Sequence, residues 1–180
     1  MKRIVADGRP SKRMTKPLVR AAEPSDIEAC VELALDATAD ANVAPTADFW
    51  REAFARDIDD SERKFVVAVS SAEIVGYARA HLFDPEPDAP SDTAPSGYYL
   101  IGLFVRLDGR RTGLGAALTD VRLRWISERA DEAWFFANAR NTASIELHRR
   151  FGFEEFTRAF SFPGLTFPGG EGILFRVRLR

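Results

Sequence analysis

The apolar run YYLIGLFV at residues 98–105 limits the possible folds more than any other stretch of the chain. It is almost entirely apolar, which is typical of a central strand that is covered on both faces. A glycine-rich turn, RLDGRRTGLG, follows it, and then an amphipathic helix, LGAALTDVRLRWISERA. A second apolar run, AWFFANA, precedes a shorter helix within NTASIELHRRFGF. This order predicts an α/β core built as strand, turn, helix, strand and helix.

The other segments extend this core to a mixed α/β fold of about seven strands and four helices. Apolar spacing predicts helices within 27–35 and 46–59, and strand-like runs at 63–70 and 73–83 are joined by a tight turn. Residues 84–97 contain four prolines and four acids with no basic residue, so they form a loop. A last strand is expected at 173–180.

The charge distribution divides the chain into a basic arm, residues 1–17, and a single domain, residues 18–180. The arm has six basic residues and one acid, although the whole chain has a net charge of −2. It has no aromatic residue to stack on bases, so a solvated tail is favoured and no nucleic-acid partner is expected.

Composition narrows the class of protein further. No apolar run reaches the length of a membrane span, and the first residues lack the apolar core of a secretory signal. The single cysteine, Cys30, excludes an intramolecular disulfide and is expected to be a buried thiol. The two histidines, His81 and His148, have no cysteine or glutamate at ligand spacing. The sequence therefore predicts a cytoplasmic protein with no membrane partner and no metal.

The glycine turn can hold a phosphate. Gly113 and Gly115 let the backbone approach a ligand, and the first amides of the following helix have no partners within the helix. Arg110 and Arg111 add cationic donors. A purely structural turn remains an alternative. The residues after Gly115 exclude a P-loop, and the bulky Leu118 excludes the dinucleotide fingerprint.

Three motifs in the expected order and spacing resemble the GNAT superfamily of acetyl-coenzyme A-dependent N-acetyltransferases. They are LFV at 103–105, RRTGLGA at 110–116 and NTASIELHRRFGF at 141–153, and the resemblance covers roughly residues 18–160. It implies a GNAT-like fold with acetyl-CoA as cosubstrate, its pyrophosphate on the amides from Arg111 to Ala116 and its pantetheine arm along the backbone of Leu103 to Val105. The residues implied to bind it are Leu103, Phe104, Val105, Arg110, Arg111, Thr112, Gly113, Leu114, Gly115, Ala116, Asn141 and Ser144.

The chain departs from the family pattern in two places. Leu107 stands where a proline is common, which loosens the turn. Ile101 and Gly102 occupy the part of the fourth strand where some members carry an acidic base. This second departure removes one standard candidate for deprotonating the amine that accepts the acetyl group.

His148 is the main candidate for chemistry. On a helix capped by Asn141, it shares a face with Ser144, beside an apolar stripe. Such a polar line is typical of a cleft wall and equally of a helix edge at the surface. By the resemblance, His148 takes the position of a tyrosine that protonates the departing thiolate. A histidine there can act as general acid or as general base, and the sequence leaves the direction open.

His81 is a weaker candidate. At the end of a strand, it is either bonded to the backbone or placed to relay the proton of the amine.

The acceptor side is expected to be acidic and to attract a cation. The acids are Asp40, Asp48, Glu52, Asp57, Asp59 and Asp60, then Asp84, Glu86, Asp88 and Asp92. Trp50, Asp84, Tyr98 and Tyr99 are the candidate substrate-binding residues, although both tyrosines suit strand packing as well.

The favoured function is direct acetyl transfer to a primary amine of a small cationic molecule, such as an aminoglycoside-like antibiotic or a polyamine. The alternatives are acetylation of protein N-termini or lysines, and a non-catalytic module that binds acyl-CoA. The acidic 84–97 loop favours a lid over the open groove that a peptide needs. A homodimer is left open.

Overall fold

The computed structural model describes residues 18–38 and 45–180. In these ranges the chain forms one seven-stranded sheet and four α-helices, as predicted. The predicted basic arm lies outside the described residues. The strands are β1 (Leu18–Ala21), β2 (Arg63–Ser70), β3 (Glu73–Phe83), β4 (Gly97–Val105), β5 (Glu132–Asn138), β6 (Glu154–Thr157) and β7 (Gly172–Arg178). The helices are α1 (Ile27–Thr38), α2 (Ala47–Asp59), α3 (Leu114–Ser127) and α4 (Thr142–Arg149), with short 3₁₀ turns at Pro24–Asp26 and Leu107–Gly109.

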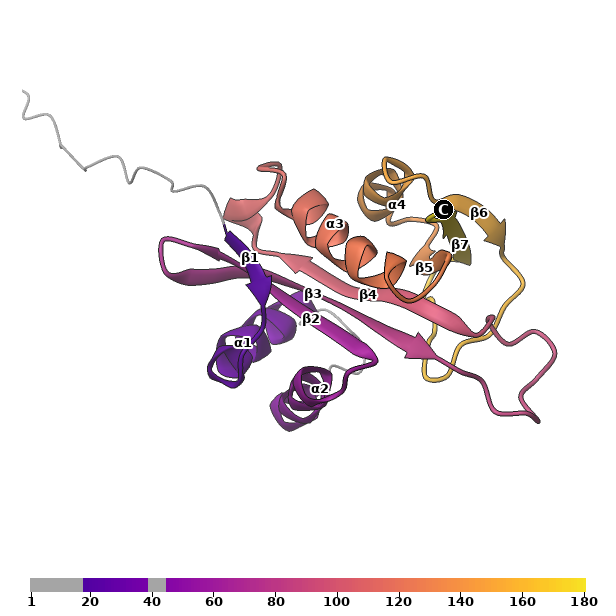
Figure 1. Ribbon diagram of the computed structural model, residues 1–180, viewed down its shortest axis with the longest axis horizontal. Coiled ribbons are helices and arrows are strands. Elements are labelled where there is room, and N and C mark those ends of the chain that lie inside the picture. Colours follow the sequence, from indigo (N-terminus) through magenta and orange to yellow (C-terminus); the bar gives the residue numbers. More distant parts are fainter. Residues whose placement is uncertain (1–17, 39–44) are drawn as a thin grey trace, which may run out of the picture.

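The sheet has the strand order β1-β2-β3-β4-β5-β7-β6, and β4 and β5 are its one parallel pair. Figure 1 shows α1 and α2 on one face and α3 and α4 on the other. Both faces of the central strands are therefore covered, which explains the continuous apolar run in β4. Cys30 lies on the buried face of α1 and is fully buried, as expected.

The parallel pairing of β4 and β5 is short. Tyr99 pairs with Trp134 and Leu100 with Phe135, and beyond these residues the two strands separate. Among the described residues, the carboxyl end of β4 therefore has no strand partner on its β5 side.

A β-bulge in β4 begins where this pairing ends. Ile101 lies opposite Arg79 of β3 and Phe104 lies opposite Tyr77, so two residues of β4 face one of β3. Gly102 has φ +54°, a backbone conformation that residues with a side chain rarely adopt. The extra residue reverses the alternation of side chains, so that Leu103 and Val105 face α3 whereas Phe104 faces α1 and α2.

Candidate functional site

The glycine turn leaves the first amides of α3 free. Arg111 and Gly113 both have positive φ, and Gly113 is the N-cap without a side chain that could accept from the helix. The first intrahelical bond runs from the Ala117 amide to the Gly113 carbonyl at 3.0 Å. The preceding amides therefore point out of the helix start, where an anion is favoured by the helix dipole.

A groove of about 550 Å³ lies between this turn, the end of β4 and the start of α4. Gly115 keeps it open, because a Cβ there would lie 3.2 Å from Leu147 Cδ2. The described residues that line it include three arginines and no acid, which suits a phosphate-bearing ligand. They are Leu103, Val105, Gly109, Arg110, Arg111, Gly113, Gly115, Ala116, Asn141, Ala143, Ser144, Leu147 and Arg150.

Nine of the twelve predicted cosubstrate residues line this groove, and three do not. Phe104 faces the other side of the sheet and packs against Tyr77, because of the bulge. Thr112 donates its hydroxyl to the Gly109 carbonyl at 2.6 Å, within the turn itself. Leu114 is buried against the sheet. Four further residues line the groove without having been predicted: Gly109, Ala143, Leu147 and Arg150. Of these, only Arg150 carries a signal in the sequence, as a cation at the end of the motif helix.

A smaller cavity of about 210 Å³ opens where β4 and β5 separate. It shares Leu103, Asn141 and Ser144 with the groove, so the two hollows adjoin. Asn141 also caps α4, since its side chain accepts from the Ser144 amide at 3.2 Å. The other lining residues are Leu100, Ile101, Gly102, Arg122, Phe135, Phe136 and His148.

His148 is buried in the wall of this cavity and is not at a surface edge of α4. Its side chain is 1 % exposed, and its ring stacks on Phe135 with centroids 3.7 Å apart. Nδ1 lies 2.8 Å from the Ser144 carbonyl, which can only accept, so Nδ1 carries the hydrogen. Nε2 is buried and has no hydrogen-bond partner among the described residues.

The surroundings of His148 disfavour its charged form. Burial, together with the charge of Arg122, lowers its pKa to about 4, despite the hydrogen bond to Ser144. At neutral pH the ring is therefore neutral, and Nε2 presents a lone pair. In this state His148 accepts a hydrogen bond or a proton and does not donate one from Nε2.

His81 lies on the opposite face, in a network of charges beneath α2. Its Nδ1 lies 3.3 Å from Arg63 Nη1, which donates to it, so its partner is a side chain and not the backbone. Burial and the charges of Arg63 and Arg79 lower its pKa to about 4. Asp57, almost fully buried, forms ion pairs with both arginines. His81 lines neither the groove nor the small cavity.

The candidate substrate residues lie apart from one another. Tyr98 faces α3, packs on Trp125 and donates to Glu62, whereas the fully buried Tyr99 faces the other way and donates to the Pro95 carbonyl at 2.7 Å. Both tyrosines therefore belong to the packed core and not to a pocket mouth.

The remaining two candidates are more accessible. Trp50 of α2 is half-buried and stacks on Phe54, and its Nε1 has no partner among the described residues. Asp84 is exposed and accepts from Ser96 at 2.8 Å.

Asp84 contributes to a third hollow, of about 560 Å³, between the 84–96 loop and the β6–β7 segment. Backbone bonds between Ala94 and Ser161 and between Ser161 and Asp92 tie the two segments together. Three acids and no basic residue are among its described lining residues, which are Phe83, Asp84, Pro85, Glu86, Asp88, Ala89, Pro90, Thr93, Ser161, Phe162 and Pro163. By contrast, Asp57 and Asp60 of the predicted acidic set pair with Arg63.

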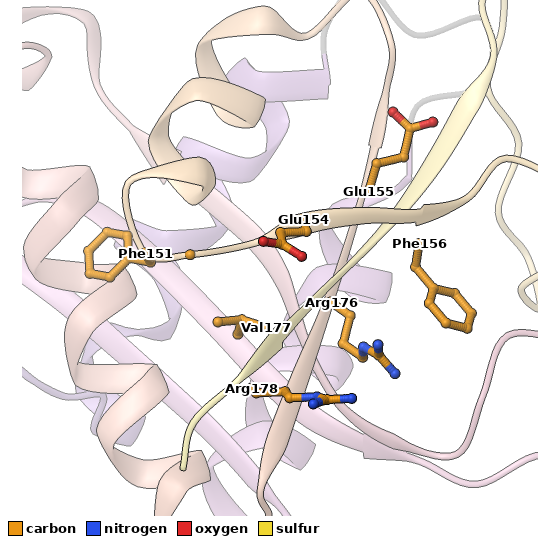
Figure 2. A pocket seen from close by; sticks show the side chains of 8 residues that line it. Phe151, Glu154, Glu155, Phe156, Arg176, Val177 and Arg178 are labelled. Atoms are coloured by element: carbon orange, nitrogen blue, oxygen red, sulfur yellow. The ribbon is translucent and has the colours of Figure 1, made fainter.

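A fourth hollow, of about 510 Å³, lies beside the sheet edge formed by β6 and β7 (Figure 2). Arg176 and Arg178 of β7 lie beside Glu154 of β6, so both signs of charge are present. It contains no predicted site residue.

Within residues 18–38 and 45–180, no cluster of three histidine, cysteine or acidic side chains could hold a metal ion. No helix in that part of the chain combines the length and apolarity needed to cross a bilayer.

Comparison with known proteins identifies the family. The family model described as "Acetyltransferase (GNAT) family" matches residues 27–153, which confirms the resemblance seen in the motifs. No curated protein sequence matches the chain.

Solved structures of the same fold agree with this assignment. An N-acetyltransferase from Staphylococcus aureus Mu50 superposes with a TM-score of 0.71 at 20% identity, over 92% of this chain and 100% of that one. The ribosomal-protein-S18-alanine N-acetyltransferase from Escherichia coli gives 0.65 at 20% identity, over 91% and 94%. NAA60 from Arabidopsis thaliana, solved with a bisubstrate analogue, gives 0.68 at 19% identity, over 91% and 98%.

Proposed function

The chain belongs to the GNAT acetyltransferase family, and we propose that it transfers an acetyl group from acetyl-CoA directly to a primary amine of a small cationic molecule. One observation carries the proposal: a groove with cationic walls adjoins a smaller cavity that is lined by His148, whose buried Nε2 has no partner among the described residues. The groove suits a nucleotide with phosphates, and the cavity suits the reacting end of its arm.

The residues present fit acetyl-CoA. The uncapped amides after Gly113, with Arg110, Arg111 and Arg150, would hold its phosphates. Leu103 and Val105, which face the groove because of the bulge, would line its arm, and Asn141 lies where the groove adjoins the cavity. Acetyl-CoA supplies an activated thioester at that point.

His148 would act as a base toward the attacking amine. The Ser144 carbonyl holds the hydrogen on Nδ1, so the cavity side of the ring is an acceptor. A tyrosine in this position would donate a proton, whereas neutral histidine accepts one. The direction that the sequence left open is therefore proposed to run from the amine to Nε2.

The acidic hollow supports a cationic acceptor. Asp84, Glu86 and Asp88 concentrate negative charge there with no basic residue in the described lining. Phe162 of this hollow contacts Phe136 of the His148 cavity, with ring centroids 5.0 Å apart. An aromatic pair thus separates the acidic hollow from the cavity, so a polyamine or aminoglycoside held by the acids would lie near the thioester.

Acetylation of a protein N-terminal amine is the second candidate. It is favoured by the Escherichia coli relative in fold, whose name gives an alanine of ribosomal protein S18 as acceptor. The bonded wall formed by the 84–96 loop and Ser161 argues against an open peptide groove on that side.

A thiol-release screen tests the proposal. The whole chain is incubated with acetyl-CoA and, separately, aminoglycosides, polyamines, amino acids and peptides, while binding of acetyl-CoA is measured by calorimetry. We expect release with polycationic small amines. Turnover with peptides alone would favour the second candidate. Binding without turnover on any amine would contradict both and favour a module that binds acyl-CoA.

A further inference from the structure

Arg122 is an unusual residue in the core of this domain. It lies on the buried face of α3, beside Leu118, Leu123 and Ile126, where an amphipathic helix normally has an apolar side chain. Its side chain is 0% exposed. In the described part of the chain no carboxylate lies within ion-pair distance of it. A buried charge without a counterion is costly, so its presence calls for a reason.

Neutral oxygens hold the guanidinium in one position. Nε donates to the Leu118 carbonyl at 3.2 Å, and Nη2 donates to Thr119 Oγ1 at 3.1 Å. Nη1 donates to the carbonyls of Arg79 at 2.9 Å and Ile101 at 3.3 Å. Arg79 and Ile101 face each other across β3 and β4 directly before the bulge. The guanidinium is thus fixed beside the residues at which β4 and β5 separate.

The guanidinium retains its charge and faces the small cavity. Burial lowers the pKa of Arg122 to about 9, so it is protonated at neutral pH. Four of its N–H groups have the partners given above, and the second hydrogen of Nη2 has none among the described residues. Arg122 and His148 line the same cavity, and both are more than nine-tenths buried.

We propose that the Arg122 guanidinium makes this cavity an anion site for the sulfur of coenzyme A, so that the sulfur departs as a thiolate stabilised by charge. The inference rests on the proposed function and deepens it. The amine nitrogen forms a bond to the thioester carbon, the carbon–sulfur bond breaks, and its electron pair goes to sulfur. The proton leaves the nitrogen for His148 Nε2 and then passes to water, so the sulfur remains a thiolate. Arg122 thereby takes over the task that a proton donor would perform, since neutral His148 has no proton to give at Nε2.

A purely structural role is the competing explanation. Arg122 satisfies two carbonyls beside the bulge, and that alone stabilises the fold. The two explanations differ in what happens to a thiol placed in the cavity, because a fixed cation facing the cavity makes the thiol more acidic and Arg122→Gln removes that effect.

The test measures the acidity of the thiol of bound coenzyme A, without an acetyl group or an amine. The ultraviolet absorbance of the thiolate is titrated for free CoA, for CoA on the wild-type chain, and for CoA on Arg122→Lys and Arg122→Gln. Calorimetry establishes saturation. We expect the bound thiol to dissociate about tenfold more readily than the free thiol, a gain that Arg122→Lys keeps and Arg122→Gln loses. Arg150→Gln, a groove arginine outside the cavity, is the matched control and should weaken binding of CoA without changing the acidity of its thiol.

The outcomes separate this inference from the proposed function. Equal acidity of free and wild-type-bound thiol overturns the role of Arg122, whatever the variants do, and leaves acetyl transfer standing. The same holds if Arg122→Gln binds CoA and retains the full gain. Failure of the wild-type chain to bind CoA at all would overturn both.

Discussion

At the scale of single residues, two neighbours determine the tautomer of His148 and the burial of its ring. The Ser144 carbonyl determines which nitrogen carries the hydrogen, and stacking on Phe135 removes the ring from water. The sequence placed a histidine where the family has a tyrosine, but it offered both directions of proton transfer. The local geometry favours acceptance at Nε2.

Substitution of His148 tests this assignment. His148→Ala should lower the rate of acetyl transfer about 10²-fold or more, because general base catalysis contributes that much. His148→Tyr should not restore the rate, since a phenol donates a proton where an acceptor is needed. Initial rates at saturating acetyl-CoA measure both variants, with calorimetric binding of acetyl-CoA as the control for folding. High activity of the tyrosine variant would support a general acid instead.

The buried imidazole also predicts how stability depends on pH. The pKa of His148 is lowered from 6.5 to about 4, so the unfolded chain binds the extra proton more readily. The stabilising contribution is present above pH 6.5 and is lost as the pH falls toward 4. Between pH 7 and pH 5 the loss is about 2 kcal/mol for this group.

Chemical denaturation at the two pH values measures it as the difference between the wild-type chain and His148→Gln. His81, with a similarly lowered pKa, is present in both chains and cancels. Parallel pH dependence of the two chains would contradict the burial of a neutral ring.

At the scale of elements, the turn before α3 and the bulge in β4 build the two walls of the groove. Gly113 and Arg111 turn the chain with positive φ, and Gly102 does so in the strand. The turn frees amides at the helix start, and the bulge directs Leu103 and Val105 toward them. Both walls depend on backbone conformation, and under the proposed function the amides of the turn would bind the phosphates together with the groove arginines.

Two glycines of similar conformation allow a matched test of the turn. Gly113 (φ +88°) and Gly164 (φ +71°) each have no atom of the described residues within 4 Å of an added Cβ. Replacement by alanine should cost about 1 kcal/mol at either position, from backbone strain alone. Gly113→Ala should in addition weaken binding of acetyl-CoA about tenfold, through misdirected amides.

Denaturation and calorimetry on both variants measure these effects. Gly164 lies outside the groove, so Gly164→Ala should leave the affinity for acetyl-CoA unchanged. Equal affinities of the two variants would show that the turn does not hold the phosphates.

At the scale of the whole molecule, segments that are distant in sequence form two hollows with opposite charge. The groove between β4, α3 and α4 is lined by arginines, and the hollow between the 84–96 loop and the β6–β7 segment by acids. Figure 1 shows that the 84–96 loop and the β6–β7 segment approach each other at the end of the molecule away from α1. An anionic cosubstrate and a cationic acceptor would thus be attracted to separate regions.

Neutralising the acidic hollow tests this division. In the triple variant D84N, E86Q and D88N, kcat/KM for a polyamine such as spermine should fall about tenfold at low salt, and less at high salt. Affinity for acetyl-CoA should stay unchanged. The variant E128Q, D131N and E132Q removes the same charge from the α3–β5 connection and the first residue of β5, and serves as control. An equal loss in both variants would show that net charge, and not this hollow, attracts the amine.

The sequence by itself determined the order of elements, the glycine turn and the family motifs, because these depend on residues close together in the chain. These motifs predicted nine of the residues that line the groove between β4, α3 and α4. Only the tertiary structure decided the contribution of Phe104, since a bulge set by β3 pairing turned its side chain away. The burial of Arg122 without a carboxylate, the tautomer of His148 and the packing of Tyr98 and Tyr99 were likewise decided by contacts between distant segments. A local pattern shows how residues are spaced along a helix or strand. The charge state and exposure of a side chain depend instead on which distant residues the fold brings next to it.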